Sequence, residues 1–425
     1  MKQINIGLIG LGTVGCGVVK TLRKFDNITI KKIAVKNLAK KRNIDNLDES
    51  ILTDDIYSVV NDKDVDIVVE VIGGVEPAFD LLKTAILNKK HIVTANKELL
   101  AKHGEELFSL ASQNNVVIMY EAAVGGGIPI IMPVKMTLAA NNITRIAAIL
   151  NGTTNYILTK MEQEGASYEE VLSEAQKLGY AETDPTGDVE GFDAAYKLAT
   201  LATIAFRKRI KIGNIYREGI TKISAKDMAY AKQLGYKIKL IALAKMDEDN
   251  RADVRVHPMM VKHKHTLAHI DGVTNAVMIE GTPVGQVILS GPGAGEMPTA
   301  SSVVGDILAI SSELDEVSSL LPMMRCTHKE NAIPKPISET LNQYYMLLDV
   351  SNEPGVIGII GNICGKHNIN LASLLQKDVF EEEEQKGAEV VVITAQCREE
   401  DVQSAIEELN SNKCINGVQN LIRVM

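Results

Sequence analysis

Acidic and basic side chains crowd one stretch in the middle of the chain, LGYAETDPTGDVEGFDAAYKL, at residues 178–198. Asp193 and Lys197 stand four residues apart in a run predicted to be helical, and therefore share one helix face. The simpler interpretation is a helix N-terminus favoured by acids, followed by an ordinary exposed ion pair. The alternative is a site in which carboxylates grip an amino acid and a lysine exchanges a proton. The carboxylates before the helix are those of Glu182, Asp184, Asp188 and Glu190.

A glycine-rich loop near the start of the chain favours the second interpretation. The apolar run INIGLIG leads into Gly10-Leu11-Gly12-Thr13-Val14-Gly15, and the helical pattern VGCGVVKTLRKF follows. In this context Gly10 permits a tight turn, Gly12 lets the backbone approach a pyrophosphate, and Gly15 lets helix and strand pack closely. The phosphates would lie at the positive end of the helix. The loop therefore predicts a dinucleotide site.

The end of the second strand bears on the choice of cofactor. The strand ITIKKIAV ends at Val35, where an NAD-selective site usually has an acidic residue for the ribose hydroxyl. Cations follow instead, which suits a 2′-phosphate and favours NADP(H); NAD(H) remains possible, and a solvated basic loop is the alternative. The residues concerned are Lys36, Asn37, Lys40, Lys41 and Arg42.

The pattern of alternating strands and helices continues to about residue 140 and predicts an α/β Rossmann-like domain. DVDIVVEVIGG, HIVTAN and VVIMYEAAV indicate strands, and PAFDLLKTAILN and KELLAKHGEELFSLASQ indicate helices. Gly73 and Gly74 end one strand at the carboxyl edge of the sheet, where ligands bind in such folds. Lys97 begins a helix at the same edge, beside the expected nicotinamide. It serves either the chemistry or solubility alone.

A triple glycine marks the end of this region. In EAAVGGGIPI, Gly125 to Gly127 predict an irregular backbone with exposed carbonyl groups. Together with Glu121, those carbonyls would hold a hard monovalent cation. A plain tight turn into a helix fits the same residues equally well.

Residues 141–294 read as an α+β domain with an antiparallel sheet and helices on one face. Asn151-Gly152-Thr153-Thr154-Asn155 offers donors for an amino-acid carboxylate, or Thr153 or Thr154 simply caps the next helix. Four irregularly spaced histidines favour a structural or surface role over a metal site. After the loop Gly291–Gly295, an apolar helix at about 295–320 is expected to return to the first domain and to place that loop near the cofactor. The histidines are His257, His263, His265 and His269.

The last part of the chain starts a new pattern after a Pro-bearing linker at 321–341. Strand YYMLLDV, helix GIIGNICGKH, strand INLASLLQKDV, acidic turn FEEEEQKG, strand AEVVVITAQ, helix EEDVQSAIEELN and strand VQNLIRVM give the order βαββαβ. This order predicts a ferredoxin-like unit over 342–425.

Composition narrows the class of protein. The chain has 425 residues and a net charge of −9, which argues against nonspecific binding to nucleic acid or to membrane surfaces. No apolar run approaches the roughly 20 residues of a membrane span, and no signal peptide precedes the first strand. The five cysteines are scattered without a CxxC pair, as expected for a reducing compartment. A cytoplasmic protein is expected.

The motifs GLGTVG, VTANKELLA, EAAVGGGIPI, LNGTTNYIL, GYAETDPTGDVEGFDAAYKLA and GPGAGEMPTASSVVGD occur in this order. Together they resemble the homoserine dehydrogenases over about residues 1–320. DVSNEPGVIGIIGNI resembles the start of an ACT domain, a module that binds amino acids. The resemblance implies reversible reduction of L-aspartate 4-semialdehyde to L-homoserine, homo-oligomerisation to at least a dimer through the middle sheet and C-terminal unit, and feedback by a pathway amino acid, with threonine expected.

The resemblance also implies residue roles. Lys197 resembles the proton donor and Lys97 the second active-site lysine, which also touches the cofactor. Glu182 and Asp193 resemble the homoserine contacts, and Asp188 lies in the same motif. Thr13, Val14, Gly179 and Gly295 resemble nucleotide contacts beside Gly10, Gly12, Gly15 and Gly73. The family's sodium site falls on Glu121, Val124, Gly126 and Ile128.

The chemistry of a hydride transfer to an aldehyde agrees with two lysines at one oxygen. The developing alkoxide needs a positive neighbour and a proton, and a lysine supplies both if its pKa falls toward neutrality. Two converging ammonium groups would lower the pKa of at least one. The alternatives are a related semialdehyde or amino-acid dehydrogenase, and a non-catalytic amino-acid sensor on the same scaffold, which the intact lysines and carboxylates argue against.

Overall fold

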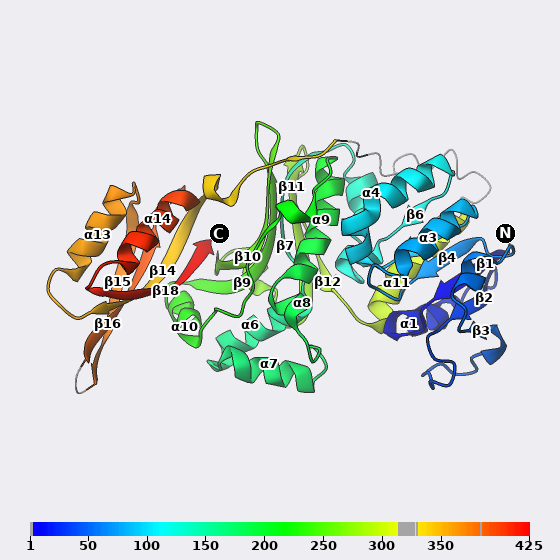
Figure 1. Cartoon of the computed structure of the whole chain (residues 1–425), viewed down its shortest axis with the longest axis horizontal. Coiled ribbons are helices and arrows are strands. Elements are labelled where there is room, and N and C mark those ends of the chain that lie inside the picture. Colours follow the sequence, from blue (N-terminus) through cyan, green and yellow to red (C-terminus); the bar gives the residue numbers. More distant parts are fainter. Residues whose placement is uncertain (1–2, 313–327, 329, 383–384) are drawn as a thin grey trace.

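The computed structural model describes residues 3–312, 328, 330–382 and 385–425. The N-terminal domain lies at one end of the elongated molecule, a large sheet with its helices in the middle, and the C-terminal unit at the other end (Figure 1). The three parts follow the three patterns read from the sequence.

The N-terminal sheet has six strands in the order β3-β2-β1-β4-β5-β6, and every pairing is parallel. This is the strand order of a Rossmann fold, so the expected α/β fold class is confirmed. The central strand β4 is buried along its whole length, which explains its continuous apolar sequence. The strands are β1 (Ile4–Ile9), β2 (Ile28–Ala34), β3 (Leu52–Thr53), β4 (Ile67–Glu70), β5 (His91–Thr94) and β6 (Ile118–Met119).

The helices of this domain include one from much later in the chain. The helix α11 (Glu296–Ser312) crosses α1 so closely that a Cβ atom at Gly17 would lie 2.6 Å from the Glu296 carbonyl oxygen. Lys20 pairs with Glu296 at 2.7 Å at the same crossing. The return of this helix to the first domain was expected; residues 313–320 of the expected segment lie outside the described residues. The other helices are α1 (Thr13–Leu22), α2 (Tyr57–Val60), α3 (Ala78–Leu87) and α4 (Lys97–Gln113).

The prediction of a long strand at VVIMYEAAV is wrong in its second half. The strand β6 ends at Met119, and a short helix, α5 (Ala122–Gly125), follows. The carboxylate of Glu121 turns back to accept hydrogen bonds from the backbone N–H groups of Ile131 and Met132, each at 2.7 Å. These bonds draw the chain out of the sheet, and the two alanines that follow favour a helical turn over a strand. A π-helical turn then spans Pro133–Thr137.

The middle of the chain forms a sheet covered by helices, and its main strands are antiparallel, as predicted, while β8 and β13 pair in parallel with β10. Its main strands pair in the order β12-β11-β7-β9-β10. The strands are β7 (Asn142–Ile149), β8 (Tyr216–Arg217), β9 (Tyr236–Met246), β10 (Arg251–Lys262), β11 (Thr274–Thr282), β12 (Gly285–Pro292) and β13 (Ile333–Pro334). The helices are α6 (Gly152–Glu164), α7 (Tyr168–Lys177), α8 (Thr186–Val189), α9 (Phe192–Phe206) and α10 (Ala225–Gln233). Short 3₁₀ turns lie at Glu49–Ile51, Ile212–Asn214, Thr266–His269 and Ile337–Glu339.

The C-terminal unit has the predicted βαββαβ order. The strands around FEEEEQKG are longer than expected: β15 reaches Glu382 and β16 starts at Gln385, while residues 383–384 lie outside the described residues. The elements are β14 (Leu341–Ser351), α13 (Val356–Lys366), β15 (Leu371–Glu382), β16 (Gln385–Thr394), β17 (Cys397–Arg398), α14 (Glu399–Asn410) and β18 (Ile415–Val424). Of the linker predicted at 321–341, residues 321–327 and 329 lie outside the described part of the chain.

The middle and C-terminal sheets are one continuous sheet, which the sequence did not predict. The strand β18 pairs in parallel with β10, with Met259 opposite Arg423, and β18 also pairs with β14 (Figure 1). The backbone N–H of Met425 extends the contact by donating to the carbonyl of Met260 at 2.8 Å. The C-terminal unit is therefore built into the middle domain and does not hang on a linker alone.

Candidate active site

Lys97 and Lys197 meet at one carboxylate. The Nζ atom of Lys97 lies 2.9 Å from Oδ1 of Asp193, and the Nζ atom of Lys197 lies 2.7 Å from Oδ2. Lys197 also donates to the carbonyl of Leu150 at 2.8 Å. The side chains of Asp193 and Lys197 are 11% and 12% exposed, whereas that of Lys97 is 41% exposed. The cluster thus opens on the side of Lys97, and the structure brings these three side chains together.

A buried network at the carboxyl edge of the N-terminal sheet positions Lys97. Asn96 caps α4 by accepting from the backbone N–H of Leu99 at 3.1 Å, so that Lys97 is the first residue of the helix. The side-chain amide of Asn96 also donates to the carbonyl of Gly74 at 2.6 Å. The fully buried Glu70 accepts from Gly73 N at 3.1 Å and from the Thr94 hydroxyl at 2.6 Å. The turn expected to face the cofactor and the helix that carries Lys97 are therefore held by one network.

Asn151 joins the acidic residues of the site. Its side-chain amide donates to Asp188 at 2.7 Å and to Asp193 at 3.0 Å. Its oxygen accepts from the backbone N–H of Thr154 at 2.8 Å and caps α6. The sequence suggested Thr153 or Thr154 as the cap; Thr153 instead donates to the Tyr180 carbonyl at 2.6 Å. An asparagine directly before a helix was the available signal for Asn151.

The charges of the cluster set its pKa values. Burial alone would raise the pKa of the Asp193 carboxyl, but the ammonium groups of Lys197 and Lys97 outweigh burial and hold that pKa well below its usual range. The charge of Asp193 raises the pKa of Lys97 against the opposing effect of burial. The carboxylate between the two lysines thus has the opposite effect on the pKa of Lys97 from the repulsion between two ammonium groups. Burial and the neighbouring Asp193 raise the pKa of Asp188.

Glu182 and Gly179 lie on the segment between α7 and α8. Glu182 is exposed, and in the described part of the chain its carboxylate makes no hydrogen bond or ion pair. The structure therefore does not bring its side chain into the lysine cluster, unlike those of Asp188 and Asp193. Gly179 ends α7 with a φ of 76°, a conformation that favours glycine.

The predicted nucleotide loop has the backbone that a pyrophosphate requires. Gly10 has a φ of 106°, and a Cβ atom at Gly15 would lie 2.2 Å from the carbonyl oxygen of Gly10. A Cβ atom at Gly12 would meet no atom within 4 Å, and Thr13, exposed like Gly12, begins α1. The loop thus leaves the end of α1 open, so these residues fit a dinucleotide. Val14, the second residue of α1, is half-buried.

The two later glycine stretches pack against each other. A Cβ atom at Gly126 would lie 2.2 Å from the carbonyl oxygen of Gly293, and Gly127 N donates to Pro292 O at 3.1 Å. Gly295 precedes α11 with a φ of 120°. The triple glycine therefore permits close contact between two backbone segments where the N-terminal and middle domains meet.

The predicted cation-binding residues surround α5. The carboxylate of Glu121 is already bonded to backbone N–H groups, and the carbonyl of Gly126 accepts from the Ser302 hydroxyl at 2.6 Å. Val124 and Ile128 are buried close by. Among the described residues, no group of three or more His, Cys, Asp and Glu side chains is arranged to hold a metal ion. A cation here would depend on main-chain carbonyl groups.

The histidines and the basic loop lie away from the lysine cluster. His257 is fully buried, with Nδ1 2.9 Å from the Pro258 carbonyl oxygen, and the rings of His263 and His269 are 6.0 Å apart. In the basic loop, Arg42 donates to the carbonyl groups of Asn37 and Lys40, each at 2.6 Å. Arg42 is thus committed to shaping the loop. The side chains of Lys36, Lys40 and Lys41 are exposed.

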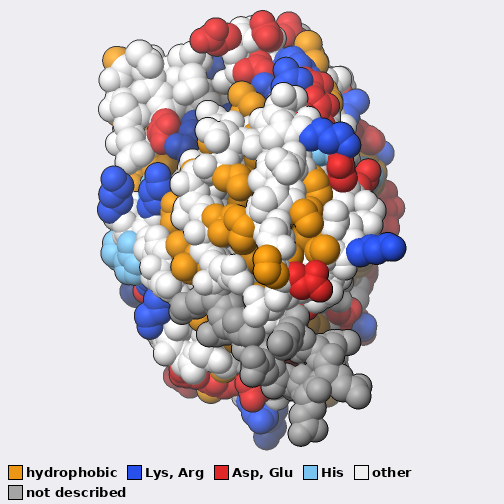
Figure 2. Space-filling view, turned by 90° about the vertical axis from the view of Figure 1, so that its left-hand side faces the viewer, with side chains coloured by type: hydrophobic (Ala, Val, Ile, Leu, Met, Phe, Trp, Pro, Cys, Tyr) orange, Lys and Arg blue, Asp and Glu red, His pale blue; other side chains and the backbone are white. Residues whose placement is uncertain are grey.

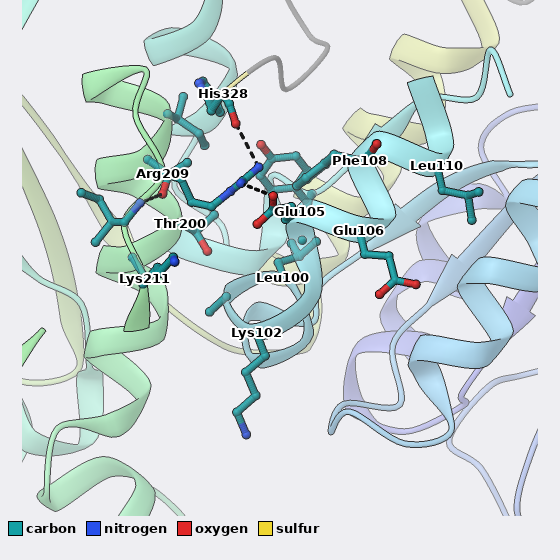
Figure 3. Close-up of a pocket in the computed structure, with 18 of the residues that line it drawn as sticks. Leu100, Lys102, Glu105, Glu106, Phe108, Leu110, Thr200, Arg209, Lys211 and His328 are labelled. Carbon is teal, nitrogen blue, oxygen red and sulfur yellow. Dashed lines mark hydrogen bonds and ion pairs between the residues drawn. The ribbon is translucent and has the colours of Figure 1, made fainter. Parts of the chain in front are cut away.

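A cavity of about 850 Å³ separates α4 from α9. Figure 3 shows Lys102, Glu105 and Phe108 on the α4 side and Thr200 on the facing helix. Arg209 pairs with Glu105 across it and donates to the His328 carbonyl at 2.9 Å. The lining includes none of Lys97, Asp193 and Lys197. The cavity is therefore distinct from the lysine cluster, although it lies along the same two helices.

A Rossmann domain with an open glycine loop, joined to a domain that brings lysines and a carboxylate to its sheet edge, defines a nicotinamide-dependent oxidoreductase. Comparison with protein families identifies which kind of oxidoreductase this is. Residues 129–308 match the homoserine dehydrogenase family, residues 10–121 match the homoserine dehydrogenase NAD-binding domain, and residues 344–414 match the ACT domain. The chain belongs to the homoserine dehydrogenase family.

Individual relatives agree, three of them over at least 99% of this chain. The chain is 44% identical to a homoserine dehydrogenase of Synechocystis over 99% of both chains, and 40% identical to that of Bacillus subtilis over 100% of this chain and 99% of the relative. The crystal structure of a homoserine dehydrogenase from Thiobacillus denitrificans matches with a TM-score of 0.92 at 38% identity, over 100% of this chain and 99% of that one. A hyperthermophilic archaeal homoserine dehydrogenase in complex with NADPH matches with a TM-score of 0.63 at 28% identity, over 73% and 98%.

These findings establish the activity. The protein interconverts L-aspartate 4-semialdehyde and L-homoserine with a nicotinamide cofactor and acts on the CH–OH group, and it carries a C-terminal ACT domain. The alternative of a non-catalytic amino-acid sensor is not favoured. No described helix is both long enough and apolar enough to span a membrane.

Proposed function

We propose that the cluster of Lys97, Asp193 and Lys197 carries the reaction, with Lys197 as proton donor. The observation that carries this proposal is the meeting of two ammonium groups on one carboxylate where the nucleotide domain contacts the middle domain. Lys197 is nearly enclosed and fixed by the Leu150 carbonyl at 2.8 Å. A fixed donor in a site with little water suits proton transfer.

Each residue has a role in this scheme. The nicotinamide, when bound, supplies or accepts the hydride. Lys197 holds a proton at Nζ and delivers it to the reacting oxygen, and Lys97 stays cationic beside that oxygen because Asp193 raises its pKa. Asp193 holds the substrate ammonium while it steers Lys197. Asp188 and Glu182 grip the amino acid: Asp188 is already joined to Asp193 by Asn151, and the exposed Glu182 is available to a ligand.

The test of the proposal is turnover in Lys197→Met. We expect turnover to fall ~10²-fold, as for removal of a positioned acid, while calorimetric titration still shows NADPH binding. Lys102→Met is the matched control, since Lys102 lies on α4 over the ring of Tyr196 at 5.6 Å and outside the cluster. Near-normal turnover in Lys197→Met would refute the assignment.

For the cofactor site, we propose Gly10, Gly12, Thr13, Val14, Gly15, Gly73, Gly179 and Gly295 together with Lys97, and a preference for NADP(H) over NAD(H). The open end of α1 and the exposed lysines of the basic loop support this. Replacing Lys36, Lys40 and Lys41 by glutamine should raise KM for NADPH more than KM for NADH. Equal changes in the two constants would contradict the preference.

We also propose Na⁺ at the main-chain carbonyls of Glu121, Val124, Gly126 and Ile128. Support comes from their grouping around α5 and from the affinity of carbonyl oxygens for hard cations. Exchange of Na⁺ for choline at constant ionic strength should lower the melting temperature. An unchanged melting temperature would contradict bound Na⁺.

The ACT domain leads us to propose threonine as effector and a homo-oligomer of at least two chains. At the end of the molecule that carries α13 and β15, hydrophobic side chains gather on the surface (Figure 2). Ile357 is 38% exposed there, and the strand β15 ends the large sheet with an open edge. Millimolar threonine should inhibit turnover, and light scattering should give at least twice the mass of one chain.

The domain division we propose is 1–140 completed by 295–320, then 141–294, a linker at 321–341, and 342–425. The separate parallel sheet and the return of α11 support it. We place the protein in the cytoplasm, since the described cysteines are all unpaired. Limited proteolysis and fractionation test the two proposals.

A further inference from the structure

The turn that leads into α9 is held from behind by the segment 217–221. The guanidinium of Arg217 donates to the carbonyl of Glu190 and lies over the ring of Phe192, with 3.4 Å between its carbon and the ring centre. The backbone N–H of Ile220 donates to the Val189 carbonyl at 2.8 Å. Phe192 is the first residue of α9, directly before Asp193. These contacts therefore fix the start of the helix that carries the catalytic carboxylate.

The turn before α9 has a backbone conformation that favours glycine, and its neighbours pack closely against it. Gly191 has a φ of 77°, and a Cβ atom there would lie 3.4 Å from Cγ of Arg217 and 3.3 Å from Cγ1 of Val256. Arg217 thus packs on the turn with its stem while its guanidinium binds the carbonyl and the ring. A planar, delocalised cation is suited to both contacts at once.

The same segment reaches the ACT domain in the opposite direction. Glu218 follows Arg217, and its carboxylate accepts from Arg423 of β18 at 2.9 Å. Arg423 is 1% exposed, and Glu399, the first residue of α14, accepts from it at 2.5 and 2.8 Å. The backbone N–H of Glu218 donates to Val256 of β10 at 2.8 Å. Arg217 and Glu218 thus connect the ion cluster around Arg423 to the turn that precedes Asp193.

We propose that Arg217 is a positioning residue for the reaction, and that the Glu218–Arg423 pair links it to the ACT domain. Arg217 touches neither lysine; it acts by fixing where Asp193 stands between Lys97 and Lys197. A change in the position of β18 or α14 reaches the catalytic carboxylate through Glu218 and Arg217. The inference rests on the proposed roles of Asp193 and Lys197.

The first test is Arg217→Met, compared with Arg217→Lys. We expect about a tenfold fall in turnover, the range found for residues that couple distant sites, and a displaced pH profile, because a shifted Asp193 changes the pKa of Lys97. Arg217→Lys keeps the charge and should restore part of the turnover and move the pH profile back. Wild-type turnover and pH profile in Arg217→Met would overturn the proposal.

The second test separates this route from a general loosening of the domain junction. Lys226→Met breaks another ion pair between the domains, Lys226 with Glu389 at 2.5 Å, which lies off the route. It should leave the pH profile unchanged, whereas Glu218→Gln should lower turnover about threefold with the same direction of pH displacement as Arg217→Met. Equal displacement in Lys226→Met and Arg217→Met would overturn the specific route.

The outcome is distinguishable from failure of the proposed function. If Lys197→Met is inactive while Arg217→Met and Glu218→Gln behave as wild type, only the positioning role fails. If Lys197→Met is active, the assignment of the catalytic cluster fails, whatever the Arg217 variants show.

Discussion

Two clusters of charged side chains in this molecule contain similar groups but differ in the exposure and bonding of their cations. The proposed catalytic cluster places two lysines on Asp193 and leaves Lys97 41% exposed. The interdomain cluster surrounds Arg423, which is 1% exposed and bonded to Glu399, Glu218 and the Tyr216 hydroxyl. In the described part of the chain Lys97 bonds only Asp193, so donors remain for a ligand.

The difference shows that a guanidinium suits a fixed junction, whereas an ammonium suits proton transfer. A guanidinium offers five donors in a fixed plane, and Arg423 uses its donors on three surrounding side chains. An ammonium on a flexible stem can change partner, which a proton donor requires. Because the interdomain cluster is buried, removal of one charged member leaves its partners without a compensating charge.

The largest effect is expected for Arg423→Met. Removing one partner of a buried ion cluster leaves carboxylates without compensation, which costs about 3–5 kcal/mol of stability. Urea unfolding should show this loss while residual folded protein still binds NADPH. A loss comparable to that of an exposed pair would mean that water reaches the cluster.

Asp193→Asn tests the other cluster. We expect turnover to fall ~10²-fold and the pKa of Lys97 to drop, because the charge of Asp193 is the main cause of its raised value. In the wild type, the Lys97–Asp193 pair stabilises the fold below the ordinary lysine pKa of 10.5 and loses this effect as pH rises through the raised value. Amine labelling of Lys97 followed by mass spectrometry between pH 7 and 11 should show an earlier midpoint in the variant. An unchanged midpoint would contradict the electrostatic account.

Tyr344→Phe should have a smaller effect. The Tyr344 hydroxyl donates to Glu399 at 2.8 Å inside the interdomain cluster. The hydroxyl also accepts from the side-chain amide of Asn342 at 3.1 Å. Loss of the two hydrogen bonds should cost about 1–2 kcal/mol, with turnover unchanged. Equilibrium unfolding measures the loss of stability, and steady-state assays measure turnover. A loss of turnover would show that the active site depends on this hydroxyl of the interdomain cluster.

The smallest effect is expected at an exposed pair. Lys366 and Glu408 lie 2.8 Å apart on the ACT domain, with Lys366 66% exposed. Lys366→Ala should leave the melting temperature unchanged, since solvent and salt screen such pairs. A clear drop in the melting temperature would show that exposure alone does not determine how much an ion pair contributes to stability.

The sequence predicted the parts of the site that local patterns determine. The glycine loop, Lys97 at a helix start and the spacing of Asp193 and Lys197 follow from short-range rules, and the structure brings the two lysines and the carboxylate together. The bridge made by Asn151 was missed, because a capping pattern does not indicate a second partner far along the chain. The raised pKa of Lys97 was not predicted, since it depends on which charge lies between the two lysines.

The same limit applies to the fold. Alternating strands and helices predicted the Rossmann domain, and the βαββαβ order predicted the C-terminal unit. The pairing of β10 with β18 joins segments far apart in sequence. Hydrophobic periodicity shows that a strand is half-buried but does not name its neighbour, so the continuity of the large sheet required the structure.

That pairing has a consequence for biogenesis. The strand β10 leaves the ribosome long before β18, so its edge at Met259 and Met260, which pairs with β18, stays without that partner while the ACT domain is being translated. This part of the large sheet is therefore completed only after the ACT domain has been translated. A nascent chain stalled before β18 would keep this short strand edge exposed, so it should aggregate more readily than the complete chain.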